Sequence, residues 1–138
     1  TPSTKAAIGD KDENISIKQM QDIIGVDLTE KIQRISVELF KFAYDFAKER
    51  GVIIADTKFE FGLDKDNKLV LIDEIFTPDC SRFWLYKNNK IDYNSFDKQF
   101  FRDYLTSIKW NNNQIQLPED IKHSLLEKYQ VAYNLITT

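Results

Sequence analysis

Three charged residues alternate with other residue types inside one apolar stretch of the sequence. Asp56, Lys58 and Glu60 lie within residues 53–62, and most of their neighbours there are apolar. In a β-strand, alternate side chains point to the same face, so these three charges are predicted to share one face. Burying charge is costly unless the charge is paired or bound to an ion. The pattern therefore indicates a functional site on a strand predicted at 52–61.

A second apolar run at 69–76 follows a polar segment that is typical of a turn, so a β-hairpin is predicted. With a four-residue loop at 65–68, Glu60 would lie directly opposite Asp73. Directly opposed residues lie about 5 Å apart at Cβ. Two carboxylates at that separation repel each other unless a cation or a proton intervenes.

Magnesium suits such a pair of carboxylates. The ion commonly takes one or two protein carboxylates, and phosphate oxygens and water complete its shell. Glu60 and Asp73 are therefore predicted to hold magnesium, while Lys58 could meet a phosphate or neutralise the carboxylates. The alternative is an exposed hairpin face with ordinary surface salt bridges, which contribute little to stability.

Two further pairs of residues could bind an anion. Ser81 and Arg82 are adjacent and just past the acidic run, and a guanidinium beside a hydroxyl suits a phosphate or a carboxylate. Lys98 and Arg102 are four residues apart on a predicted helix, so the two cations would share a face. The alternatives are a surface arginine beside a turn serine and a solvated helix face.

Composition limits the classes of protein to which the chain can belong. The chain has 138 residues and a formal net charge of −3, which argues against nucleic-acid binding through bulk electrostatics. The single cysteine, Cys80, excludes an intramolecular disulfide and fits a reducing compartment. No apolar run reaches the roughly 20 residues that span a bilayer. We therefore predict a cytoplasmic protein with no membrane partner.

Periodicity and capping residues predict an α+β fold. A small, mostly antiparallel sheet would contain the 52–61 and 69–76 strands and pack against a helix at 30–50. The apolar stripe of that helix is predicted to be Ile32, Ile35, Leu39, Phe42, Phe46 and Ala47. The other predicted elements are helices at 16–24, 95–108 and 118–136 and a polar loop at 86–95.

The stretch Ile54-Ala55-Asp56-Thr57-Lys58-Phe59-Glu60-Phe61-Gly62 resembles the signature of SAICAR synthetase, an enzyme family of purine biosynthesis. Further separated blocks resemble the longer, fungal-like form of the family. These blocks are residues 1–5, 12–16, 73–74, 77–79, 81–84, 93, 97–100, 118–121 and 128–129. Agreement across so many separated blocks is a more specific signal than any one motif.

The resemblance implies an ATP-dependent ligase. This family joins carboxyaminoimidazole ribonucleotide (CAIR) to L-aspartate, with ATP and Mg²⁺ as cofactors, and releases SAICAR, ADP and phosphate. A carboxylate is a poor acyl donor, so the expected route passes through an acyl phosphate. The expected partners are these small molecules, with no nucleic acid.

The resemblance also implies roles for individual residues. Lys58 and Asp56 are the expected catalytic residues, and Glu60 and Asp73 are the expected magnesium ligands. Lys58 and Asp73 would also contact the ATP cofactor. The expected substrate-binding residues are Lys5, Asp12, Ser81, Arg82, Lys98 and Arg102.

The chain departs from the family pattern in two places. The family often has histidine where this sequence has Lys11. Its N-terminal nucleotide-binding lobe is not found in the sequence. Residues 1–138 are therefore predicted to be the C-terminal substrate- and metal-binding part of a kinase-like or ATP-grasp-like enzyme, inactive alone. The alternatives are a catalytically inactive nucleotide-binding module and an interaction domain of the same fold.

Overall fold

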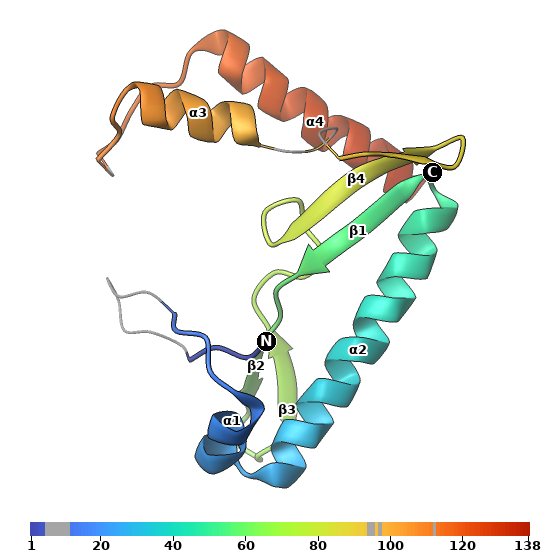
Figure 1. Ribbon diagram of the computed structural model, residues 1–138, viewed down its shortest axis with the longest axis vertical. Coiled ribbons are helices and arrows are strands. Elements are labelled where there is room, and N and C mark those ends of the chain that lie inside the picture. Colours follow the sequence, from blue (N-terminus) through green and yellow to red (C-terminus); the bar gives the residue numbers. More distant parts are fainter. Residues whose placement is uncertain (5–11, 94–95, 97, 112) are drawn as a thin grey trace. The chain divides into compact units, whose positions relative to one another are not determined.

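The computed structural model describes residues 1–4, 12–93, 96, 98–111 and 113–138 (Figure 1). Two compact units divide the chain, Thr1–Leu39 and Phe40–Thr138. The elements are α1 (Ile17–Ile24), α2 (Val26–Glu49), β1 (Val52–Thr57), β2 (Glu60–Leu63), β3 (Leu69–Ile72), β4 (Ser81–Lys87), β5 (Lys90–Asp92), α3 (Gln99–Ser107) and α4 (Glu119–Thr137). The α+β class is therefore confirmed, as are four helices close to their predicted bounds.

The first unit begins with two short segments that pair with each other. Ser3 and Asn14 form an antiparallel bridge, which the backbone hydrogen bond from Thr4 N to Glu13 O extends. Helix α1 then starts at a capping box, in which the Ser16 hydroxyl accepts from Gln19 N and the Gln19 side chain accepts from Ser16 N. The predicted cap at Ser16 is confirmed.

In the second unit, the last turns of α2 bury a different face from the one predicted. Ala47 lies in the core, and Phe40 and Ala43 pack against it. Phe42 is 74% exposed, so its predicted place in the core was wrong. Phe42 instead stacks with Phe46, at 6.4 Å between ring centroids. The predicted core place of Ala47 is confirmed, whereas Ala43 and Phe40 were not part of the predicted stripe.

The core of the second unit lies on a three-stranded antiparallel sheet with the strand order β1-β4-β5. Val52, Ile54 and Phe83 are buried there together with Ala47 of α2 and Ala132 of α4. Figure 1 shows β1 and β4 side by side, and α4 contacts β1. Within this unit, the last turns of the predicted 30–50 helix thus pack on β1, which lies in the predicted 52–61 strand, and β4 takes the place of the predicted 69–76 strand.

The segment 86–95, predicted to be a loop, contains a second hairpin. Strands β4 and β5 pair through Lys87 and Lys90, so only Asn88 and Asn89 lie between them. Both asparagines have positive φ, at 51° and 57°. A two-residue turn with two left-handed residues matches the right-handed twist of the flanking strands. The Asn-Asn pair was a usable turn signal that the prediction overlooked.

The long strand predicted at 52–61 is divided between two sheets. Strand β1 ends at Thr57 and pairs with β4, whereas β2 begins at Glu60 and pairs with β3. The prediction that Asp56 and Glu60 share one continuous strand was therefore wrong. The second predicted strand, 69–76, ends already at Ile72.

The hairpin of β2 and β3 exists, but its predicted register was wrong by one residue. Glu60 pairs with Ile72, not with Asp73. Asn67 takes a left-handed φ of 58°, and Asp64 N donates to Lys68 O at 3.0 Å. This turn leaves a loop of three residues, 65–67, instead of four. The cross-strand partner of every residue in the hairpin therefore differs from the predicted one. A one-residue slip moves each side chain to the opposite face.

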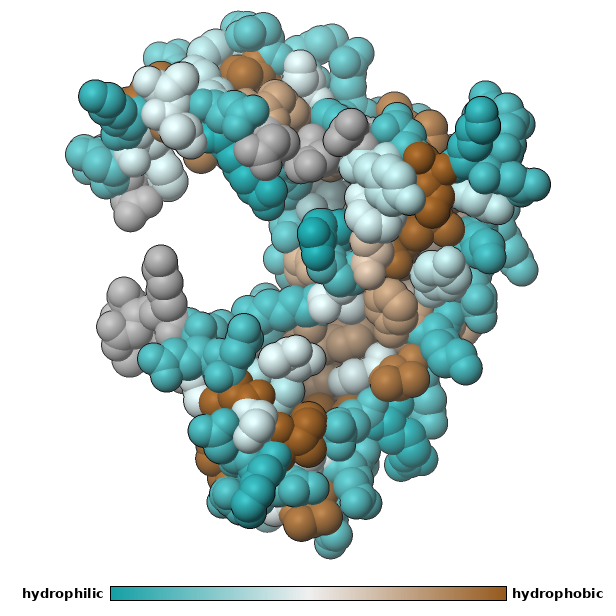
Figure 2. Space-filling model, viewed as in Figure 1, coloured by the Kyte–Doolittle hydropathy of each residue, from teal (hydrophilic) through white to brown (hydrophobic). Residues whose placement is uncertain are grey.

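Surface properties agree with the composition. Most of the face drawn in Figure 2 is hydrophilic, and its apolar residues form separate patches. Among the helices that the structure describes, none carries an apolar stretch long enough to cross a lipid bilayer.

Replacing Gly51 with alanine is expected to lower the free energy of unfolding by about 1–3 kcal/mol. Gly51 has a φ of +78°, and an added Cβ would lie 3.1 Å from Tyr86 O. Urea denaturation measures the change. Gly62→Ala is the matched control, because its Cβ would meet Ile72 at an ordinary 3.5 Å. Equal losses in the two variants would contradict the backbone argument.

Candidate functional site

An ion pair joins β1, an edge strand, to β4, the middle strand of the three-stranded sheet. Arg82 Nε donates to both carboxylate oxygens of Asp56 at 2.9 Å, and a terminal guanidinium nitrogen contacts Oδ2 as well. A β-bulge creates this pairing, because the register shifts between Ile54 and Asp56. The extra residue, Ala55, places Asp56 opposite Arg82 rather than Ser81. Bulges often redirect side chains beside functional sites.

The Arg82–Asp56 pair keeps its carboxylate ionised. Hydrogen bonds from Arg82 lower the pKa of Asp56 below its ordinary 3.8, although burial acts in the opposite direction. Side chains of both residues remain well exposed, at 70% for Arg82 and 49% for Asp56. A solvent-accessible pair of this kind contributes little to stability. The pair does hold the Arg82 guanidinium in a fixed direction near the first residue of β4.

Hydroxyls and one thiol form a polar cluster at the residues that follow Asp56 and precede Arg82 in the sequence. Thr57 and Ser81 are paired across the strands, with 2.7 Å between their hydroxyl oxygens. Cys80 Sγ lies 3.5 Å from the hydroxyls of Ser81 and Thr77. Burial raises the pKa of Cys80, but the hydrogen bonds from Ser81, Thr77 and Thr57 together lower it below the ordinary value. Ser81 is thus a buried member of a polar cluster next to Arg82.

Lys58 and Glu60 form the second charged feature of the site. Their side chains share a face as predicted, with 2.7 Å between Lys58 Nζ and Glu60 Oε1. The Glu60 side chain is only 15% exposed, so the neighbouring ammonium compensates a largely desolvated carboxylate. Phe59, between them, packs its ring edge-on against Phe76 at 5.3 Å. This aromatic contact anchors the segment that carries the two charges.

Asp73 follows directly after the last residue of β3. It is exposed and has a φ of +66°, a conformation that non-glycine residues rarely adopt. The predicted direct pairing with Glu60 was wrong, because Ile72 takes that position. A left-handed residue redirects the chain, so strand alternation no longer fixes the direction of the Asp73 side chain.

The carboxylates fit a magnesium ion that is shared with phosphate, rather than a site built from protein ligands alone. Among the described residues, no group of three or more His, Cys, Asp or Glu side chains could hold a metal. Glu60, with the nearby Asp73, offers the one or two carboxylates that Mg²⁺ commonly takes from a protein when phosphates and water supply the rest. Lys58 places a cation 2.7 Å from the Glu60 carboxylate.

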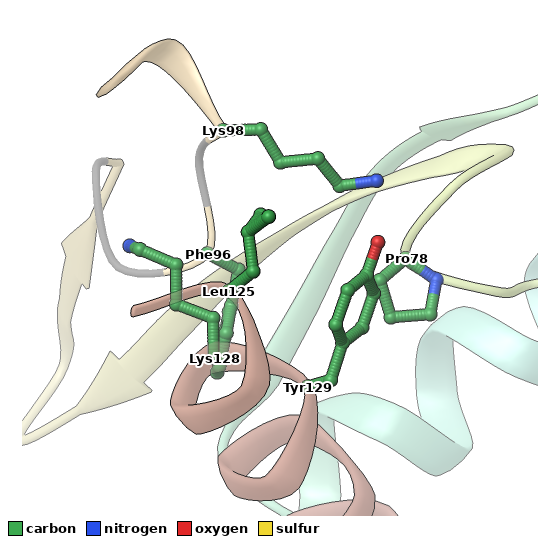
Figure 3. Close-up of a pocket in the computed structure, with 6 residues that line it drawn as sticks. All are labelled: Pro78, Phe96, Lys98, Leu125, Lys128 and Tyr129. Carbon is green, nitrogen blue, oxygen red and sulfur yellow. The ribbon is translucent and has the colours of Figure 1, made fainter. Parts of the chain in front are cut away.

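Lys98 is held by two residues that the sequence analysis did not single out. Its amine donates to Asp79 Oδ1, and the Tyr129 hydroxyl donates to the same oxygen at 2.8 Å. Figure 3 shows the Lys98 side chain extending above the Tyr129 ring, with the hydroxyl directed toward the amine. Asp79 follows Pro78 in a turn, and Tyr129 lies 50 residues further along. No local signal could have linked them.

The pKa shifts of this triad follow from its hydrogen bonds. The bond from Lys98 is the main cause that lowers the pKa of Asp79, and the Tyr129 hydroxyl adds to it. Burial acts to lower the pKa of Lys98, but the contacts with Asp79 and Tyr129 outweigh it and raise the pKa. The pKa of Tyr129 is raised, chiefly by burial. Asp79 is therefore anionic and Lys98 cationic at neutral pH.

The remaining predicted substrate-binding residues are less closely defined. Lys98 immediately precedes α3, and Arg102 is an exposed residue in its first turns. Asp12 is exposed next to the paired N-terminal segments. Lys5 and Lys11 lie outside the described residues. The structure thus brings Arg82 together with Asp56, and Lys58 together with Glu60.

Asp56→Asn is expected to reduce stability more at about pH 6 than at about pH 3. A carboxyl group with a lowered folded-state pKa contributes stability that is fully present above its unfolded pKa. That stability is lost as the pH falls through the folded pKa, which for Asp56 lies below 3.8. Urea denaturation at both pH values measures the difference in free energy of unfolding between wild type and variant. If this difference in free energy is the same at the two pH values, the predicted role of the Arg82 bond is contradicted.

Comparisons with known proteins agree with one another. A sequence model described as SAICAR synthetase matches residues 1–117. The phosphoribosylaminoimidazole-succinocarboxamide synthase of Neisseria meningitidis serogroup B is 49% identical over 141 aligned residues, which cover 99% of this chain and 49% of that protein. The chain therefore spans about half the length of the curated relatives it matches.

Solved structures give the same result. The SAICAR synthase from Saccharomyces cerevisiae complexed with SAICAR aligns with a TM-score of 0.76 and 46% identity, covering 91% of this chain and 44% of that one. A SAICAR synthetase in complex with ADP aligns with a TM-score of 0.64 and 29% identity, covering 94% of this chain and 46% of that one.

Proposed function

Because the chain belongs to the SAICAR synthetase family, we propose that it forms part of an ATP-dependent ligase that joins CAIR to L-aspartate. The single observation that carries this proposal is 49% identity extending over 99% of the chain. The charged residues fit the proposal: Lys58, Glu60 and Arg82 offer groups for phosphates and a metal. An inactive module of the same fold would have no need for these groups together.

The proposed reaction has two balanced steps. A carboxylate oxygen of CAIR forms a bond to the γ-phosphorus of ATP, the bond to the bridging oxygen breaks, and ADP leaves. The amine of aspartate then attacks the acyl carbon, a C–N bond forms, the C–O bond to phosphate breaks, and the amine loses a proton. When bound, Mg²⁺ would offset negative charge on the phosphate oxygens.

Lys58 and Glu60 are proposed to act at the nucleotide phosphates. Glu60, with Asp73, would hold the metal, and both Lys58 and Asp73 would contact ATP. In the structure Lys58 already compensates Glu60 at 2.7 Å. With a metal held at that carboxylate, the Lys58 ammonium would be available to a phosphate oxygen. This arrangement keeps the partly buried Glu60 paired throughout, which avoids the cost of an uncompensated charge.

Arg82 and Ser81 are proposed to bind the ribonucleotide phosphate. A guanidinium offers several donors in a planar fork, so Arg82 can keep Asp56 on one edge and bind phosphate with another. Asp56 has a lowered pKa, which makes it a weak proton acceptor. We therefore assign Asp56 to orienting Arg82 and bordering the substrate, not to general-base catalysis. Lys5, Asp12, Lys98 and Arg102 remain proposed substrate-binding residues.

A further lobe of the protein would complete the site. We propose that a nucleotide-binding lobe, outside the 138 residues, supplies the rest of the ATP pocket, so that this chain alone is inactive. The chain's match to about half of each relative supports this proposal. A cytoplasmic location is proposed as well, from the purine-pathway reaction and the single cysteine.

An assay of the complete protein that contains this chain tests the function. With ATP, Mg²⁺, CAIR and L-aspartate present, mass spectrometry should detect SAICAR formed in equal amount with ADP. Omission of any one substrate should stop product formation. CAIR labelled with ¹⁸O in its carboxylate should pass one labelled oxygen to phosphate. ADP binding without product under these conditions would instead support the inactive-module alternative.

A further inference from the structure

Two residues outside the proposed binding set hold the Lys98 amine in place. We propose that Asp79 and Tyr129 are positioning residues that fix the direction of the Lys98 ammonium toward an anionic group of the ribonucleotide substrate. This inference rests on the proposed function, in which Lys98 binds substrate. It adds that Asp79 and Tyr129 determine where the Lys98 amine lies.

The hydrogen-bond geometry carries the proposal. Asp79 Oδ1 accepts from both the Lys98 amine and the Tyr129 hydroxyl, the latter at 2.8 Å. These residues come from the turn before β4, the start of α3 and the middle of α4. A single oxygen thus ties three separate segments together. Hydrogen bonds to charged groups are the stronger class, so this contact restrains the lysine more than a neutral bond would.

The aromatic ring restrains the same side chain a second time. Lys98 Nζ lies 5.2 Å from the centroid of the Tyr129 ring, within the range of a cation–π interaction. Close by, a cavity of about 10 Å³ has room for no more than a single water. It is lined by Pro78, Phe96, Lys98, Leu125, Lys128 and Tyr129 (Figure 3). The lysine side chain is only 22% exposed, so few rotamers remain available to it.

Lys98 can meet substrate without leaving this arrangement. An ammonium has three N–H donors, so the bond to Asp79 does not exhaust it. Asp79 is more exposed than Lys98, at 61% against 22% for the side chains, so the pair is open to solvent on the Asp79 side. Tyr129 donates a hydrogen bond to Asp79 and so keeps the carboxylate in place when the lysine moves slightly toward an anion.

Tyr129→Phe in the complete protein tests the role of the hydroxyl. It removes the bond to Asp79 and keeps the ring beneath Lys98. We expect KM for CAIR to rise about three- to tenfold, with kcat and KM for ATP changed less than about twofold. Tyr133→Phe is the matched control, since Tyr133 lies one turn further along α4 and is 63% exposed. It should leave all three constants unchanged.

Asp79→Asn provides a second, independent variant. An amide oxygen can still accept from Tyr129 but lacks the negative charge that holds the ammonium, so KM for CAIR should rise at least as much as in Tyr129→Phe. If Tyr129→Phe fails to fold, this variant decides the question by the same criterion. Values of KM equal to that of the folded Tyr133→Phe protein would overturn the positioning role.

Different results would contradict the positioning role of Asp79 and Tyr129 and the proposed ligase function. An active wild-type protein with unchanged KM in the variants contradicts only the positioning role of Asp79 and Tyr129. A folded wild-type protein that neither binds CAIR nor forms SAICAR contradicts the proposed function, and the inference falls with it.

Discussion

Glu60→Gln in the complete protein is expected to lower kcat about 100-fold or more, with little change in the free energy of unfolding. The variant keeps the size of the side chain and removes its charge. Lys58 then lacks the carboxylate that lies 2.7 Å from its amine, and the proposed metal loses a ligand. Steady-state kinetics at saturating substrates measures kcat, and urea denaturation measures stability.

Asp66→Asn is the matched control for Glu60→Gln. Asp66 is an exposed carboxylate in the loop of the same hairpin. Its loss changes the net charge by the same amount and should leave kcat within about twofold of wild type. Near-wild-type turnover of Glu60→Gln would remove Glu60 from the metal-binding role.

Arg82→Ala is expected to raise KM for CAIR at least about tenfold, because a guanidinium bound to phosphate contributes charge-assisted hydrogen bonds. The effect on kcat should be smaller than the effect on KM. Lys87→Ala is the control, since Lys87 is an exposed cation at the other end of the same strand. An unchanged KM for CAIR in Arg82→Ala would contradict the phosphate assignment.

A double-mutant cycle separates the two roles of Arg82. If Asp56 acts by orienting the guanidinium, Asp56→Asn should raise KM for CAIR in the wild-type background and have little further effect in Arg82→Ala. Independent, additive effects would mean that Asp56 contacts the substrate without acting through Arg82.

Local signals accounted for the helices. Ser16 begins α1 with its capping box, and Gly51 follows α2 with the left-handed φ expected of a helix stop. The buried face of α2 was misplaced because Phe42 and Phe46 carry most of the apolar signal. Tertiary packing buries the predicted Ala47 together with Phe40 and Ala43, and the exposed phenylalanines stack on each other.

Strand pairing was harder to predict because it depends on contacts between distant segments. The hairpin was found from its turn, but the left-handed Asn67 shortened the loop and shifted the register. Nothing in the local sequence marks the bulge at Ala55 or the pairing of β1 with β4. Both follow from packing of the whole sheet.

Alternation along one strand predicted some of the side-chain pairs of the candidate site and not others. Alternation placed Lys58 beside Glu60, as the structure has it. It also placed Asp56 with them, whereas Asp56 pairs with Arg82 on the neighbouring strand. Asp79 and Tyr129 meet only through the fold, so spacing could not reveal them.

Glu60 and Asp73 are proposed to hold the magnesium ion of a bound nucleotide. The most direct measurement is a titration of Mg²⁺ into the complete protein with saturating ADP, followed by NMR of the ¹³C-labelled side-chain carboxyl groups. We expect saturable shifts at Glu60 and Asp73 and none at the control carboxylate Asp66. Magnesium-dependent binding of ADP with no shift at either Glu60 or Asp73 would contradict the claim.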